Sequence, residues 1–134
     1  MSVSILGGGA FGTALAVALA RKGPVVLWAR DAGAVRKMRE TGSNPRLPDC
    51  NLHDSAPNLE MTDDLAHAYA ADVLLLATPM QAMADLLASI EDPLTGSVLV
   101  SCSKGSDLHA LTGPTAVIAQ AKPQALPAIL TGPS

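Results

Sequence analysis

The chain has 134 residues, enough for one domain with a buried core and too few for two domains of ordinary size. Hydrophobic residues make up 49% and aromatic residues 2%, which predicts elements covered on both sides and a core of Ala, Leu and Val. The net charge of −3 disfavours nucleic acid and acidic membrane surfaces as partners, and no apolar run approaches the roughly 20 residues of a membrane span.

Targeting and redox features favour the cytoplasm. The N-terminus has neither a basic segment before an apolar stretch nor a small-residue cleavage site, so no signal peptide is expected. Cys50 and Cys102 are spaced neither as a metal knuckle nor as a redox pair, and we expect two reduced thiols. His53, His67 and His109 are scattered without ligand spacing, so no metal site is predicted.

The first third of the chain predicts two strands, each followed by a helix. Val3–Leu6 is a short apolar run that ends in glycines and indicates a buried strand. Residues 11–23 carry strong helix formers and close on Arg-Lys-Gly, as a helix does. A second buried strand is expected at Val25–Trp28, and a second helix from about Ala32 to Glu40.

The middle of the chain predicts a long loop and then a return to regular elements. Residues 42–61 are rich in Pro, Asn, Asp and Ser and indicate a loop, with a short strand near Leu59–Met61. Thr62 or Asp63 can cap a short helix after it. Asp72–Thr78 is the clearest strand, because its large apolar residues are continuous, as in a central parallel strand.

The last third continues the alternation. Pro79 opens a predicted helix that runs to about Ile90, and Ser97–Ser101 is a further strand. A helix at about residues 114–121 and a last strand at Ala128–Leu130 follow. Strands and helices that alternate in this way predict an α/β fold with a doubly wound parallel sheet and right-handed crossovers, that is, a Rossmann-like domain.

A glycine-rich turn marks the first junction between strand and helix. The segment GGGAFG places Gly7, Gly9 and Gly12 in the pattern G-x-G-x-x-G. The first glycine allows a tight turn, the second lets the backbone approach a pyrophosphate, and the third lets helix and strand pack closely. Because the N-terminus of the helix attracts phosphate charge, the turn predicts a dinucleotide site; a glycine turn without a ligand is the alternative.

The end of the second strand, LWARD, bears on the choice of cofactor. An acid there bonds the ribose 2′-hydroxyl of NAD, whereas an Arg accommodates the 2′-phosphate of NADP. We expect Arg30 to face the adenosine ribose, which favours NADP or the use of both cofactors. Asp31 could be the acid of an NAD site, but its place before a helix favours a cap.

Two further pairs of residues are expected to have structural roles. Asp63 and Asp64 resemble a catalytic carboxylate pair, but they start a helix, which favours capping over acid–base chemistry. Met80 and Met83 lie at helical spacing and are expected in the core.

Seven short motifs follow the order that they have in one enzyme family. They are GGGAFGTALA at Gly7–Ala16, LWAR at Leu27–Arg30, NPRLP at Asn44–Pro48, TDDL at Thr62–Leu65, ATP at Ala77–Pro79, SKG at Ser103–Gly105 and LTGPS at Leu130–Ser134. Over its whole length the chain resembles the N-terminal domain of the bacterial-type NAD(P)-dependent sn-glycerol-3-phosphate dehydrogenases. It departs from them at Arg46, where an aromatic residue is usual, and at Met80, where a small polar residue is usual.

The resemblance implies cofactor contacts beyond the three glycines. Ala10 and Phe11 would lie against the cofactor diphosphate and nicotinamide, and Arg30 against the adenosine. Pro79 and Lys104 would also contact the cofactor.

The resemblance also implies a substrate pocket. Lys104 would meet both cofactor and substrate as a supporting catalytic residue, and Gly132 and Ser134 would belong to the pocket. Lys104 follows a predicted strand at the edge where open sheets bind ligands, and a cation suits both a substrate phosphate and the charge that develops on a carbonyl oxygen. A surface lysine in a turn is the alternative.

The reaction implied by the resemblance is reversible hydride transfer between NAD(P)H and dihydroxyacetone phosphate, which gives sn-glycerol 3-phosphate for phospholipid synthesis. In that family the main general acid/base is a lysine of a second, helical domain that these 134 residues lack. We therefore expect residues 1–134 to form a dinucleotide-binding domain, cut at its C-terminal end, that binds cofactor without normal turnover.

Other functions and partners remain open at this stage. A small phosphorylated molecule is the expected partner, and a homo-oligomer is allowed. Another two-domain NADP-dependent reductase, such as a 2-ketoacid or ketopantoate reductase, is one alternative function. A non-enzymatic dinucleotide-sensing module is the other.

Overall fold

The computed structural model describes residues 2–7, 9–42, 52, 57–78, 80–102 and 114–129, without the side chains of residues 10, 80, 81, 114 and 115. The strands are β1 (Val3–Leu6), β2 (Val25–Trp28), β3 (Leu59–Thr62), β4 (Val73–Leu76), β5 (Val98–Ser101) and β6 (Leu126–Ile129). The helices are α1 (Ala10–Ala20), α2 (Ala32–Thr41), α4 (Leu65–Tyr69), α5 (Met80–Ser89) and α6 (Pro114–Ala121).

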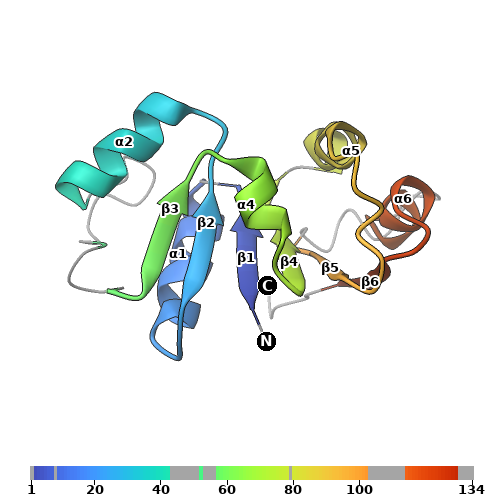
Figure 1. The fold of residues 1–134 in the computed structure, drawn as a ribbon, viewed down its shortest axis with the longest axis horizontal. Coiled ribbons are helices and arrows are strands. Elements are labelled where there is room, and N and C mark those ends of the chain that lie inside the picture. The colour runs from blue at the N-terminus through green and yellow to red at the C-terminus, as the bar shows by residue number, and fades with distance from the viewer. Residues whose placement is uncertain are drawn as a thin grey trace.

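The six strands form one sheet in the order β3-β2-β1-β4-β5-β6, and every neighbouring pair is parallel (Figure 1). Because β1 lies between β2 and β4, the chain builds outward from β1 in one direction and then in the other. This is the strand order of a doubly wound dinucleotide-binding fold. The predicted fold class is therefore confirmed.

Helices cover both faces of the sheet, and each face has its own apolar core. Residues of α1 and α2 pack on one face against the buried side chains of Ile5, Val25, Leu27, Met61 and Leu75. Residues of α4, α5 and α6 pack on the other face against Leu6, Trp28, Leu74, Leu76 and Leu99. Strands buried on both sides explain why their sequences read as continuous apolar runs.

Helix α5 confirms part of the prediction that residues at helical spacing face the core. Met83, Leu86, Leu87 and Ile90 are buried, as their helical spacing predicts. Met80 is the first residue of α5, and its side chain lies outside the described part of the structure.

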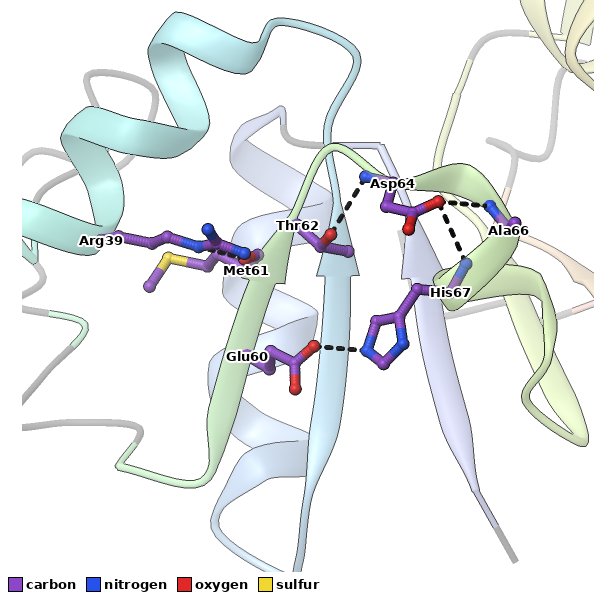
Figure 2. Close-up of polar contacts among 7 residues, drawn as sticks. All are labelled: Arg39, Glu60, Met61, Thr62, Asp64, Ala66 and His67. Atoms are coloured by element: carbon purple, nitrogen blue, oxygen red, sulfur yellow. Dashed lines mark hydrogen bonds and ion pairs between the residues drawn. The ribbon is translucent and has the colours of Figure 1, made fainter.

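The short helix α4 is capped by a different residue from the one predicted. Asp64 is its N-cap and accepts hydrogen bonds from the backbone N–H groups of Ala66 and His67 (Figure 2). Thr62 Oγ1 accepts from the N–H of Asp64 at 3.0 Å and so fixes the turn before the helix. The expectation that Thr62 or Asp63 is the cap was wrong, and the capping role expected of the Asp63-Asp64 pair is confirmed for Asp64 alone.

The last strand begins two residues earlier than predicted, at Leu126 instead of Ala128. The observed strand thus includes Pro127, which has no N–H for the ladder. A strand at the edge of a sheet tolerates proline, since one of its sides makes no ladder bonds. The N–H of Leu126 donates to the carbonyl oxygen of Ser97 at 2.8 Å and starts the pairing with β5.

Within the described ranges, no helix is both long enough and apolar enough to cross a membrane.

Candidate dinucleotide site

The turn between β1 and α1 requires glycine at its first position. Gly7 has φ +133°, a conformation that residues with a side chain rarely adopt. A Cβ atom there would lie 2.8 Å from the carbonyl oxygen of Ala77, just beyond β4. The backbone of the turn therefore rests directly on the end of the neighbouring strand.

The other two glycines of the pattern differ in what surrounds them. A Cβ at Gly12 would lie 2.2 Å from the carbonyl oxygen of Gly7, so α1 packs too closely on the turn for any side chain. A Cβ at Gly9 would meet nothing within 4 Å. Gly12 is thus required by packing, whereas Gly9 leaves open space beside the backbone, where a ligand could approach.

Helix α1 begins at this turn without a side chain over its N-terminus. Its N-cap is Gly9, no side-chain hydrogen bond from the described residues caps it, and no acidic residue lies in its first turn. By contrast, α2 and α4 are capped by the carboxylates of Asp31 and Asp64. The uncapped N–H groups and the positive end of the helix dipole suit an anion such as a pyrophosphate.

The glycine turn also lies at the topological switch point. It follows the carboxyl end of β1, which lies between β2 and β4. Helix α1, which leads to β2, packs on one face of the sheet, and α4, which leads to β4, packs on the other face. Open α/β sheets bind ligands in the crevice at this position. Its backbone is tied to the β2 side by a hydrogen bond from the N–H of Gly7 to the carbonyl oxygen of Trp28.

Thr78 belongs to the same edge and was missed by sequence reasoning. It follows β4, and its Cγ2 lies 3.2 Å from a Cβ built on Gly7. Its Oγ1 is buried and has no hydrogen-bond partner among the described residues. A buried hydroxyl without a partner beside a glycine turn fits a site that receives a polar ligand. The ATP motif around it was the available signal.

The cofactor-facing residues predicted along α1 and β2 are brought to this edge. Ala10 and Phe11 are the first residues of α1, and the Phe11 side chain is 55% exposed. Arg30 is exposed two residues after β2 ends. Their contacts with a cofactor stay predictions, but a large exposed aromatic ring and an exposed cation after the end of β2 are suitable for them.

Asp31 has a structural role. Its Oδ1 accepts hydrogen bonds from the N–H groups of Gly33 at 2.9 Å and Ala34 at 3.2 Å, which makes it the N-cap of α2. The preference for a cap over the acid of an NAD site is confirmed by this geometry.

Four predicted site residues, Pro79, Lys104, Gly132 and Ser134, lie outside the described residues. The last described residue before Lys104 is Cys102, whose N–H donates to the carbonyl oxygen of Leu76 at 3.1 Å. Residue 102 therefore continues β5 toward the same edge as the glycine turn. Cys102 is a free cysteine, and burial raises the pKa of its thiol to about 11, so the thiol is protonated near neutral pH.

The expectation that the chain has no metal site stays a prediction. Among the described residues, no three His, Cys, Asp or Glu side chains come close enough to hold a metal ion. His53 and His109 lie outside these residues, and His67 is paired with Glu60 (Figure 2).

The strand order, the glycine turn at the switch point and the uncapped helix behind it place this chain in the class of Rossmann-like domains. A family model described as "NAD-dependent glycerol-3-phosphate dehydrogenase N-terminus" matches residues 2–134. The chain belongs to this family, as its motifs predicted.

Individual relatives agree with this assignment. The chain is 52% identical over 134 residues to "Glycerol-3-phosphate dehydrogenase [NAD(P)+]" of Paracoccus denitrificans, covering 100% of this chain and 40% of that protein. It is 47% identical over 135 residues to the protein of the same name from Ruegeria sp., covering 100% of this chain and 41% of that protein. The chain thus spans about 40% of the length of these curated relatives.

Solved structures share the fold. The crystal structure of glycerol-3-phosphate dehydrogenase from Coxiella burnetii has a TM-score of 0.71 at 27% identity, over 99% of this chain and 41% of that one. A UDP-D-ManNAc dehydrogenase from Pyrococcus horikoshii has a TM-score of 0.70 at 14% identity, over 100% of this chain and 37% of that one. The second likeness concerns the fold alone.

Proposed function

We propose that these residues form the cofactor-binding domain of an oxidoreductase that transfers hydride between NAD(P)H and dihydroxyacetone phosphate to give sn-glycerol 3-phosphate. The observation that carries the proposal is the uncapped N-terminus of α1 at Gly9, with open space beside it at the switch point of the sheet. Membership of the glycerol-3-phosphate dehydrogenase family supports the substrate.

The residues present fit a dinucleotide. The backbone around Gly9 and the N-terminus of α1 would hold the pyrophosphate, and Phe11 would lie toward the nicotinamide. Arg30 would lie beside the adenosine ribose, where its charge favours a 2′-phosphate. When bound, the nicotinamide supplies or accepts the hydride.

The substrate end of the site belongs to residues beyond the described part of the chain. Lys104 would place a cation near both cofactor and substrate, and Gly132 and Ser134 would complete the pocket. The relatives are more than twice as long as this chain, and we propose that the principal acid/base residue lies in the part that these 134 residues do not match. Alone, the chain is then expected to bind the cofactor but not to catalyse the reaction at rates typical of the family. The expected location of the protein is the cytoplasm.

Titration of the 134-residue chain with NADPH and with NADH tests the proposal. We expect saturable binding, tighter for NADPH, and an Arg30→Ala variant should weaken NADPH binding about tenfold while changing NADH binding less. An activity assay with dihydroxyacetone phosphate should show no turnover at rates typical of whole dehydrogenases. Absence of binding to both nucleotides would refute the cofactor role, and full turnover would refute the need for a further domain.

The dinucleotide-sensing module remains the second candidate, because the described part of the chain contains the three glycines of the pattern and a helix N-terminus without a side-chain cap. A coding sequence that ends at Ser134 would favour it over the enzyme.

A further inference from the structure

A hollow of about 320 Å³ lies at the edge of the sheet opposite the glycine turn. It is bordered by the beginnings of β1, β2 and β3 and by the C-terminal end of α4, where Ala70 and Ala71 line it. The candidate dinucleotide site lies beyond the carboxyl ends of the same strands. The hollow is therefore separate from that site, and its size is at the lower end for pockets that hold small molecules.

The floor of the hollow contains a polar group without a partner. Ser4 of β1 is 0% exposed, and its Oγ makes no hydrogen bond with any described residue. Ser4 pairs in register with Val26 of β2, and Val26 pairs with Glu60 of β3. Because paired residues of parallel strands share a face, Ser4, Val26 and Glu60 form a row beneath α4. Burying a hydroxyl without a partner is costly, and a ligand that bonds it would recover that cost.

One wall of the hollow carries a carboxylate and an imidazole in contact. The Glu60 carboxylate from β3 and the His67 imidazole from α4 point toward each other and are in contact through Oε2 and Nε2 (Figure 2). Their side chains are 54% and 50% exposed, so both also face solvent. The carboxylate can accept further hydrogen bonds besides the one from His67, because an ionised carboxylate has about four acceptor positions.

The charges around the hollow favour a cation. No Lys or Arg is among its lining residues, so an anion would meet Glu60 without a basic partner other than His67, which is already paired. The C-terminal end of α1 also points to this edge, and helix C-termini carry partial negative charge. Asp72, next to the lining residue Ala71, is already bonded: hydrogen bonds from the backbone N–H and the hydroxyl of Ser2, together with the positive N-terminus, lower the pKa of its carboxyl group.

The remaining lining residues are Ser2, Asn58 and four aliphatic residues. Val3, Pro24, Val25 and Val26 lie at the beginnings of two strands, and of these Val26 shares the face of Ser4. A ligand that fits the hollow therefore needs a positive group for Glu60, a hydrogen-bonding group for Ser4 and a short apolar part between them.

We propose that the hollow binds a short aliphatic amino alcohol. Its ammonium group donates to the Glu60 carboxylate beside His67, its hydroxyl exchanges a hydrogen bond with Ser4 Oγ, and its carbon chain lies across Val26. The site is independent of the dinucleotide site, so either proposal can fail without the other.

The probe 4-aminobutan-1-ol tests the proposal in the 134-residue chain, with binding followed by amide chemical shifts in NMR. We expect saturable shifts centred on Ser4, Val26 and Glu60. Butane-1,4-diol, which lacks the charge, should bind at least about tenfold more weakly, because hydrogen bonds to ionised groups are the stronger ones. n-Butylamine, which lacks the hydroxyl, should bind several-fold more weakly, roughly the effect of one neutral hydrogen bond.

Two variants and one matched control complete the test. Glu60→Gln should weaken binding of the amino alcohol about tenfold, and Ser4→Ala several-fold, with the preference for amino alcohol over butylamine lost in Ser4→Ala. Ser4→Ala removes a hydroxyl that has no partner, so the fold should persist, which a thermal melt checks. Glu91→Gln changes an exposed carboxylate away from the hollow and should have no effect.

Several results would overturn the proposal. These are shifts that do not saturate, equal binding of the diol, unchanged affinity in Glu60→Gln or in Ser4→Ala, and a crystal structure with the probe in which only water lies against Ser4 Oγ.

Discussion

The N–H of Gly7 donates a hydrogen bond to the carbonyl oxygen of Trp28 at 2.9 Å, and this bond ties the glycine turn to the end of β2. On its other side the turn rests on Ala77 after β4. The turn is thus fixed between the two strands that flank β1, which holds the N-terminus of α1 in place before any ligand arrives. Such preorganisation reduces the entropy that binding must offset.

Gly7→Ala should destabilise the fold. Alanine would be strained at φ +133°, and its Cβ would lie 2.8 Å from the carbonyl oxygen of Ala77. We expect the free energy of unfolding to fall by about 2–4 kcal/mol, measured by urea denaturation. Gly23→Ala is the matched control, because a Cβ there meets nothing within 4 Å, and it should change stability by less than about 0.5 kcal/mol. Equal effects would contradict the assigned role of Gly7.

Gly9→Ala should separate binding from stability. Gly9 has φ −72° and ψ −178°, which alanine adopts easily, and a Cβ there meets no protein atom. The added methyl would instead occupy the space where a pyrophosphate approaches the backbone. We expect the melting temperature to stay near that of the wild type and NADPH affinity to fall about tenfold or more, read by calorimetry. Unchanged affinity would place the pyrophosphate elsewhere.

Asp64→Ala and Asp63→Ala compare adjacent carboxylates. Asp64 caps α4 through two backbone N–H groups, whereas the side chain of Asp63 is exposed and does not cap the helix. Loss of the Asp64 cap should cost about 1 kcal/mol of stability, and the Asp63 change less than about 0.5 kcal/mol. Denaturant melts of the two variants side by side decide whether the cap lies at residue 64.

Lys122→Met should weaken the contact between α5 and α6. Lys122 is 6% exposed at the end of α6, and its Nζ donates to the carbonyl oxygen of Ile90 just after α5. Methionine keeps most of the buried apolar contact but leaves that carbonyl without its donor, at a cost of about 1–3 kcal/mol. Lys37→Met, on the exposed side of α2, is the control and should be nearly neutral. Hydrogen exchange would be expected to rise first around residues 86–90.

Cys102 should react slowly with iodoacetamide in the folded state. Burial raises the pKa of its thiol from 9.0 to about 11, so at pH 8 only about a thousandth of it is thiolate. The rate should increase with pH up to about 11, and unfolding in urea should raise the rate at pH 8 roughly tenfold or more. A Cys50→Ser background isolates this thiol. Because the raised pKa favours the protonated folded state, its contribution to stability is complete below pH 9.0 and is lost as the pH passes about 11.

Local patterns predicted most of the fold because they are produced by local physics. Apolar runs of β1, β2 and β4 reflect burial on both faces, and G-x-G-x-x-G reflects steric limits within a single turn. The prediction started β6 two residues too late; its edge position, which makes Pro127 acceptable, depends on the assembled sheet.

The features that were missed depend on packing between segments distant in sequence. Thr78 is significant only because Gly7 lies against it, and Ser4 only because no described residue bonds its hydroxyl across the sheet. The sequence predicted no partner for His67, and the packing of α4 beside β3 pairs it with Glu60. No sequence spacing encodes these contacts directly.

Trp28 is the single tryptophan of the chain, and it is both nearly buried and bonded at two points. Its indole Nε1 donates to the carbonyl oxygen of Asp63, while its own carbonyl oxygen holds Gly7. The intrinsic tryptophan fluorescence of the molecule therefore comes from a single indole, at the edge of the sheet where a nicotinamide cofactor would lie. Quenching of its emission would follow occupancy of that edge without any attached dye.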